Sequence, residues 1–205
     1  MPLLALSDAA SLVQMAEQRS EVQAATQRIL TSGMATSREG AFAVSIVGIE
    51  PERELPVNLV AQNVTAGRAL AADDRDAVII GQGLATAMGV EVGDRFTLVG
   101  RAMHQQMRQR TMAIVGIYDL GMADIEKRAI YLALGEAQDL YLEPGQATEV
   151  ALWLAQLGQE DAVMEALTPQ MPGYELASWR TSFPELVQTM ATKGAVMDLF
   201  GVVML

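Results

Sequence analysis

The sequence predicts an α+β fold, in which a split βαβ sheet of the ferredoxin-like, porter-type kind is interrupted by a smaller inserted α/β subdomain. Two observations lead to this prediction. Stretches of strand length and short amphipathic helices follow one another as β-α-β-β near the N-terminus and as β-α-β near the C-terminus. Proline-containing turns at Pro51, Pro56 and Pro144 separate these two halves from the residues between them.

The N-terminal part of the chain supplies the first half of the predicted sheet. Residues 3–6 are a short apolar strand candidate, and a Ser-Asp pair then caps the helix that follows. Residues 21–30 and 42–47 alternate between two faces, as strands do. The polar, glycine-containing residues 31–40 predict a turn between these two strands.

The predicted insert is organised around residues 76–98. A buried strand, a two-turn helix and a second strand follow one another there, and Gly81 and Gly89 mark the ends of the helix. Gly81 and Gly83 suggest a dinucleotide-binding fingerprint, but Thr86 holds the place of the third glycine and no acidic residue follows about 20 residues later. The sequence therefore favours a compact strand–helix–strand corner over a nucleotide site.

The insert continues as a hairpin whose connection carries a local excess of positive charge, and a helix over residues 134–142 follows it. Residues 96–100 pair with residues 111–118, and no acidic residue occurs between Asp94 and Asp119. The connection is either a docking element for a partner protein or an anionic substrate, or a solvated turn. The candidate contact residues are Arg101, His104, Arg108 and Arg110.

The second half of the predicted sheet follows the insert. Residues 148–155 alternate as a strand, residues 159–171 have the spacing of an amphipathic helix, and residues 174–179 return as a strand. We therefore expect a discontinuous porter-type subdomain, an inserted subdomain with the basic hairpin, and a stalk helix that runs into a truncated transmembrane segment. Their expected boundaries are residues 1–60 with 144–182, residues 61–143 and residues 183–205.

The C-terminal residues predict a long helix. Ser182 and Glu185 form a capping box, and apolar residues at helical spacing continue from there. Residues 195–205 are apolar apart from Asp198, whereas a bilayer span needs about 20 such residues. We interpret them as the first turns of a membrane helix that is cut off. The alternative is a terminal core helix that packs on the sheet.

The composition excludes several classes of function. The formal net charge is −11, so the chain has no general basic surface to neutralise nucleic-acid phosphates or to bind an anionic membrane face. It contains no cysteine, which excludes disulfides, thiol catalysis and thiolate metal sites. Hydrophobic residues make up 51% of the chain but aromatic residues only 5%, so the predicted core is aliphatic, with scattered methionines as packing residues.

No set of residues in the sequence assembles an active site. His104 is the only histidine and lies in the polar hairpin connection, where we expect it to be exposed. Asp73, Asp74 and Asp76 lack the glycine and the distal glutamate of a calcium loop. We therefore expect no catalytic residue, no cofactor and no metal, and a protein that is not an enzyme. The alternative is a small enzyme with an unrecognised carboxylate pair.

A set of short motifs in a fixed order covers nearly the whole chain. The longest is G-x-x-L-A-x-x-x-G-V-x-x-G-D, which begins at Gly81 and ends at Asp94. In this order they resemble the extracytoplasmic, periplasmic core domain of FtsX-like and MacB-like ABC transporter permeases. The other motifs are Val47-Gly48-Ile49-Glu50-Pro51, Gly67-Arg68, Ile114-Val115-Gly116-Ile117, Ala137-Gln138 and Trp179-Arg180.

The resemblance implies a permease domain that couples cytoplasmic ATP hydrolysis to substrate export or lipoprotein release by mechanotransmission. The implied partners are an ABC ATPase subunit, reached through the membrane domain, a second permease subunit in a homo- or heterodimer, and a periplasmic partner protein. The implied location is the inner membrane, with this domain facing the periplasm or the cell exterior. The alternative is a freestanding periplasmic or secreted binding module without a membrane anchor.

The basic hairpin departs from the family pattern in one respect. In the lipoprotein-release relatives, a proline-bearing hook loop in a similar place recruits a periplasmic carrier. The connection of this chain is short and has no proline between Arg101 and Arg110. The resemblance therefore does not by itself assign a carrier to this hairpin.

Overall fold

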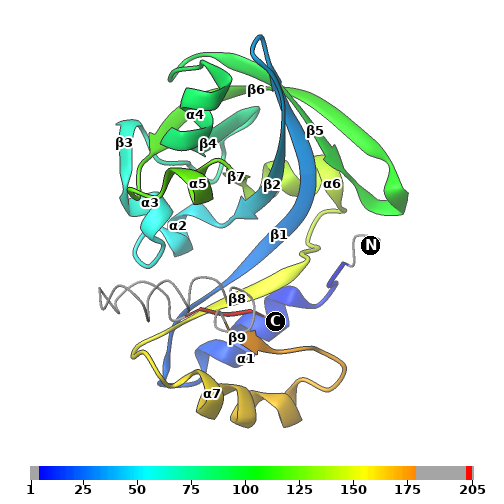
Figure 1. The fold of residues 1–205 in the computed structure, drawn as a ribbon. Coiled ribbons are helices and arrows are strands. Elements are labelled where there is room, and N and C mark those ends of the chain that lie inside the picture. The colour runs from blue at the N-terminus through cyan, green and yellow to red at the C-terminus, as the bar shows by residue number, and fades with distance from the viewer. Residues whose placement is uncertain (1–4, 179–201, 205) are drawn as a thin grey trace. The chain divides into compact units, whose positions relative to one another are not determined.

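The computed structural model describes residues 5–178 and 202–204 (Figure 1). The chain divides into two compact units. The larger unit consists of Met1–Ser7 and Arg28–Thr148, and the smaller unit consists of Asp8–Gln27 and Glu149–Leu205. The long strand β1 (Val22–Ser37) contributes its first residues to the smaller unit and the rest to the larger unit.

Six strands of the larger unit pair in a closed ring. Besides β1 they are β2 (Gly40–Ile49), β4 (Ala77–Gly81), β5 (Arg95–Arg101), β6 (Met107–Tyr118) and β7 (Ala129–Ala133). The order is β2-β7-β4-β6-β5-β1, and β1 pairs again with β2. The β2–β7 and β4–β6 pairs are parallel and the others are antiparallel. The short β3 (Val64–Gly67) pairs with β6 outside this ring.

The alternation of side chains along the strands explains which residues fill the ring. In β5 every second residue is buried. All five residues of β4 are buried, because its two faces contact two separate apolar clusters. Val78 and Ile80 belong to the main cluster. Ile79 packs with Val47 and Tyr118 in the second cluster.

Short helices connect the strands of the larger unit. They are α2 (Pro51–Glu54), α3 (Leu59–Gln62), α4 (Gln82–Met88), α5 (Ala123–Glu126) and α6 (Leu134–Tyr141). Helix α4 ends at Gly89, whose φ of 62° lies in the left-handed region that favours glycine. Helix α6 packs on β2 at Gly48, where a Cβ atom would collide with the side chain of Ala137.

A buried ion pair joins β1 to α2. The Arg28 guanidinium donates from Nε and Nη2 to the two carboxylate oxygens of Glu54, at 2.8 and 2.7 Å. Asn58 donates from Nδ2 to the same carboxylate at 2.5 Å. The Glu54 side chain is fully buried, so these three donors replace the water that its charge would otherwise bind.

The smaller unit combines two helices with a short sheet. Its strands pair in the order β1-β8-β10-β9. Helix α1 contacts β8, and α7 contacts β9 and β10. The Tyr174 hydroxyl donates to the carboxylate of Asp8, just before α1, at 2.7 Å. The remaining elements are α1 (Ala9–Glu17), β8 (Glu149–Leu154), α7 (Glu160–Leu167), η2 (Thr168–Gln170), β9 (Ala177–Ser178) and β10 (Val202–Met204).

The structure is a mixed α/β fold dominated by sheet, which confirms the coarse prediction. The turn predicted at residues 31–40 is wrong for most of its length, because β1 continues to Ser37 and pairs there with both β2 and β5. Thr31 and Ala35 are buried between exposed neighbours. The strand period is therefore present, but the polar and glycine residues between the inward side chains concealed it.

The strand order of the smaller unit differs from the predicted split βαβ order. That order needs residues 3–6 as a strand of the sheet, but Leu6 forms a single bridge with Ala147, and residues 1–4 lie outside the described residues. The place between β8 and β9 is taken by β10, which is antiparallel to both. The β-branched pair Val202 and Val203 suits this strand.

The C-terminal helix predicted over residues 183–205 lies largely outside the described residues. At residues 202–204 the prediction is wrong, because these residues form β10. Within the described part of the chain, no helix is both long and apolar enough to cross a membrane. The two compact units also have other boundaries than the expected domains. The pairing of β2 with β7 joins residues 28–60, which we expected in the porter-type subdomain, to residues 61–143, which we expected in the insert.

We expect Glu54→Ala to lower the free energy of unfolding by about 3 kcal/mol, because it leaves the Arg28 guanidinium largely buried without its carboxylate. Urea unfolding followed by circular dichroism measures this change. Glu52→Ala, an exposed acid in the same helix, is the matched control and is expected to change stability by less than about 0.5 kcal/mol. Equal effects of the two substitutions would contradict the assignment.

Candidate functional site: the arginine-bearing hairpin and its base

The four contact residues expected from the sequence lie on the hairpin formed by β5 and β6. Arg101 is the last residue of β5, and His104 lies in the single 3₁₀ turn η1 (Met103–Gln105) at the tip. Arg108 and Arg110 follow in the first half of β6. His104 is exposed and has a φ of 56°, so a side chain other than glycine occupies the left-handed region at this turn.

The hairpin register separates these residues onto two faces. Arg108 lies opposite Gly100, and two residues further Arg110 lies opposite Leu98, so both arginines share one face. Arg101 lies opposite Met107 and shares the other face with it. The structure therefore brings Arg108 and Arg110 together but not Arg101 with them.

The arginines also differ in their partners. Arg110 donates to the Asp76 carboxylate at 3.2 Å, and both side chains are well exposed. Arg108 donates only to the Gln106 side chain, at 3.3 Å, and forms no ion pair with any described residue. The carbonyl of Arg101 accepts a 2.8 Å hydrogen bond from the Thr31 hydroxyl, which ties the end of β5 to β1. Arg108 thus has no acidic partner among the described residues, whereas Arg110 is paired with Asp76.

A buried acid lies at the base of the hairpin, which sequence reasoning missed. Glu136, in the first turn of α6, is 2% exposed, and its Oε1 has no hydrogen-bond partner. Its Oε2 lies 3.9 Å from the Nε of Arg75. Burial raises the pKa of Glu136, and this effect exceeds the opposing effects of the Asp76 backbone hydrogen bond and of Arg110 and Arg75.

Tyr141, at the end of the same helix, shares this environment. Burial is the main cause that raises its pKa, and the charge of Glu136 adds to it. Its ring lies against Gly100 of β5, where a Cβ atom would collide with it. Gly100 therefore lets the hairpin lie against α6.

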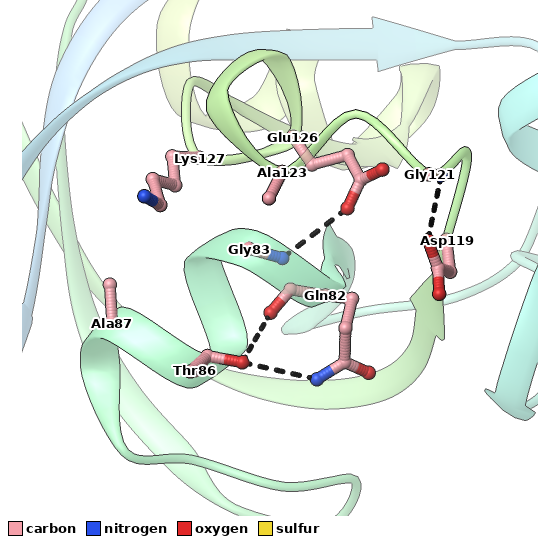
Figure 2. Close-up of a pocket in the computed structure, with 9 residues that line it drawn as sticks. All are labelled: Gln82, Gly83, Thr86, Ala87, Asp119, Gly121, Ala123, Glu126 and Lys127. Carbon is pink, nitrogen blue, oxygen red and sulfur yellow. Dashed lines mark hydrogen bonds between the residues drawn. The ribbon is translucent and has the colours of Figure 1, made fainter.

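A pocket lies at the strand–helix–strand corner, where the sequence suggested an incomplete dinucleotide fingerprint (Figure 2). The pocket has a volume of about 490 Å³. It lies between α4 on one side and the loop and helix around α5 on the other. Its lining residues are Gln82, Gly83, Thr86, Ala87, Asp119, Gly121, Ala123, Glu126 and Lys127.

The Glu126 carboxylate organises this corner. Its Oε2 accepts a hydrogen bond from the Gly83 N–H at 3.3 Å, as Figure 2 shows. Its Oε1 accepts from the N–H groups of Leu120 and Met122, both at 2.9 Å. An internal carboxylate thus accepts from the N–H of Gly83 in the first turn of α4, which is where a bound phosphate lies in a dinucleotide fold.

The two glycines of the fingerprint have a packing role. A Cβ atom at Gly81 would collide with Glu126, and one at Gly83 would collide with the backbone of Ala123. These glycines let α4 and α5 approach closely. Within the described residues, no group of three or more His, Cys, Asp or Glu side chains is arranged to hold a metal ion.

Two solved structures share this fold. The extracellular domain of the noncanonic ABC-type transporter YknZ from Gram-positive bacteria has a TM-score of 0.53 and 14% identity, over 76% of this chain and 77% of that one. The periplasmic region of MacB from Actinobacillus actinomycetemcomitans has a TM-score of 0.53 and 13% identity, over 96% of this chain and 86% of that one. At these identities the two structures show a shared fold.

The sequence itself identifies the family of the chain. The family model described as MacB-like periplasmic core domain matches residues 1–170. The chain therefore belongs to the family of MacB-like periplasmic core domains of ABC transporter permeases, as its ordered motifs predict. This family is a transporter domain and not itself catalytic. No curated protein matches the chain significantly.

We expect Gly83→Ala to destabilise the larger unit by about 1–3 kcal/mol, because its Cβ meets the Ala123 backbone, which cannot rotate away. Gly135→Ala is the matched control, since this glycine also lies in a helix but faces only the flexible end of Arg75. The control is expected to be neutral or to stabilise by about 0.5–1 kcal/mol. Thermal or urea unfolding compares the two, and a neutral Gly83 variant would contradict the close helix approach.

We expect Glu136→Gln to remove a pH dependence of stability. Because the folded-state pKa is raised above its usual value of 4.5, the folded state binds more protons than the unfolded state between these two pKa values. The free energy of unfolding therefore falls as pH rises through that range, and the Gln variant escapes this loss. Its stability relative to the wild type should rise as the pH increases above 4.5, as urea midpoints measure. Asp139→Asn, at an exposed acid of the same helix, is the control.

Proposed function

We propose that this chain is the extracytoplasmic domain of an ABC transporter permease subunit, and that it couples cytoplasmic ATP hydrolysis to substrate export or lipoprotein release by mechanotransmission. The observation that carries the proposal is the family match over residues 1–170. In this proposal the ATPase activity belongs to a separate nucleotide-binding subunit or domain. The domain faces the periplasm or the cell exterior, and the permease lies in the inner membrane with a second permease subunit.

The proposal assigns the hairpin a role in partner or substrate contact. Arg101, His104, Arg108 and Arg110 are its contact residues. The support is that the hairpin concentrates positive charge in a chain of net charge −11, and that Arg108 has no acidic partner among the described residues. A periplasmic partner protein is the occupant that this ribbon suits, because residues 107–111 form an exposed, extended strand and not an enclosed site for a small molecule.

Two structural expectations belong to the same proposal. The first is a stalk helix within residues 183–201, which would carry motion between the membrane and the folded units. The second is a split βαβ connectivity in the smaller unit, supported by α1 before β1 and by α7 between β8 and β9.

A freestanding periplasmic or secreted binding module is the second candidate function. The absence of a membrane-spanning helix from the described residues is compatible with it. The two candidates differ in whether the protein in the cell has a membrane anchor and an ATPase partner.

We expect the full-length gene product to fractionate with membranes and to copurify with an ABC ATPase, because a permease domain transmits ATP-driven motion through its membrane helices. Detergent extraction, affinity purification and an ATPase assay test this. A soluble product without an ATPase would contradict the permease assignment and favour the binding module.

The same preparation tests the hairpin. Replacing Arg101, Arg108 and Arg110 by serine should leave membrane fractionation and ATPase association unchanged and reduce partner binding and transport. Arg38→Ser, at the exposed turn between β1 and β2, controls for the loss of a surface charge. Unchanged partner binding and transport in the triple variant would remove the contact role from the hairpin.

A further inference from the structure

One edge of β6 is open near the tip of the hairpin. On one side, β6 pairs with β5 from Met107 to Ala113. On its other side, β4 begins to pair only at Ala113, and β3 pairs further along. Within the described residues, no strand covers the second side of residues 107–111. Figure 1 shows this two-stranded ribbon extending beyond β4 and β7.

The hydrogen bonds at the two ends of the ribbon fix which backbone groups point to the open edge. Ile114 donates to the carbonyl of Asp94 at 2.9 Å, and Ala102 donates to the carbonyl of Gln106 at 2.8 Å. Since bonded and non-bonded pairs alternate in an antiparallel ladder, the even-numbered residues of β6 bond to β5. The odd-numbered residues direct their N–H and C=O groups to the other side.

Ala113 confirms this alternation. Its N–H points away from β5 and donates to the carbonyl of Asp76 at 2.7 Å, where β4 takes over the edge. Towards the tip, the equivalent groups belong to Thr111, Gln109 and Met107. These three residues therefore present a row of unpaired donors and acceptors at the spacing of a β-ladder.

The side chains around this edge are accessible and basic. All five residues from Met107 to Thr111 are exposed, with Met107 at 60%. Arg108 and Arg110 lie on one face of the edge. Arg110 is paired with Asp76 at 3.2 Å, whereas Arg108 has no acidic partner among the described residues. A strand that adds here would place alternate side chains beside these arginines, so acidic residues at those positions would form charge-assisted contacts.

We propose that the open edge of β6 binds an extended, acidic segment of a partner protein by strand addition. Backbone hydrogen bonds to Met107, Gln109 and Thr111 supply the pairing, and Arg108 and Arg110 select for acidic side chains. This inference rests on the proposed role of the hairpin as a contact surface and names the partner chemistry for it.

A second copy of this chain suits the edge less well. If two β6 edges paired around a two-fold axis, the arginines of each would lie among the arginines of the other, and like charges across a ladder are destabilising. The arginines thus act against self-pairing, as charged residues on edge strands commonly do, while they favour an acidic strand.

Synthetic peptides test the proposal on the 205-residue chain. The probe is a nine-residue peptide that alternates glutamate with threonine and has blocked ends. Saturating peptide is expected to slow amide hydrogen exchange of Met107, Gln109 and Thr111 by about tenfold or more, without changing the amides already bonded to β5. The same peptide with lysine in place of glutamate is expected to give no protection, and Arg108→Ser is expected to weaken binding by about fivefold or more.

Two further arms separate strand addition from simple charge attraction. Gln109→Pro removes an N–H that faces the open edge but none that bonds to β5, so it should abolish binding, whereas Gln109→Ala should not. A glutamate–threonine peptide with N-methyl groups at alternate residues should also fail, which tests the same point without changing the protein. Equal binding by the N-methylated peptide would overturn strand addition in favour of charge attraction alone. If neither acidic peptide binds, the proposal is also overturned, and the arginines serve only to protect the edge against self-pairing.

The outcome is independent of the permease assignment. Loss of strand addition with intact membrane fractionation and ATPase association would overturn this inference and leave the proposed function standing. Peptide binding by a protein that proves to be soluble and without an ATPase would support this inference and overturn the permease assignment.

Discussion

The closure of six strands into one ring is the constraint on which the larger unit depends. It is completed by two contacts between distant parts of the chain, the parallel pair of β2 with β7 and the antiparallel pair of β1 with β5. Closure gives most strands two partners and encloses an aliphatic core, but the β5–β6 ribbon is longer than β4. The ribbon therefore leaves the ring with one side that no described strand pairs, and a stretch with four arginines and no acidic residue lies on it.

Three buried glutamates show how short helices are held to this ring. The carboxylate of Glu54 is satisfied by a guanidinium and an amide, and that of Glu126 by three backbone N–H groups. Glu136 keeps one oxygen without a hydrogen-bond partner, so burial raises its pKa. The first two act as hydrogen-bond acceptors that hold α2 and α5 in place. The third is a local cost in stability beside the base of the hairpin.

The glycine pair at the start of α4 illustrates how a motif can be read in two ways. As sequence letters, Gly81 and Gly83 suggest a turn that lets a phosphate approach a helix N-terminus. In the structure the same freedom lets a second helix approach, and the Glu126 carboxylate occupies the place of the anion. The corner therefore serves to pack α4 against α5.

The sequence by itself determined the mixed α/β class, the strand–helix–strand corner, the basic hairpin and the family, because each depends on residues that lie near one another in the chain. It failed at residues 31–37, where glycine and polar residues on the outer face of β1 concealed a strand, and at residues 202–204, where a helical pattern became a strand. It also gave no sign of the buried roles of Glu54, Glu126 and Glu136. Only the tertiary structure decided these points and the open edge of β6, because each depends on which distant parts of the chain lie side by side. At the edge, β4 begins opposite Ala113, so no described strand covers residues 107–111.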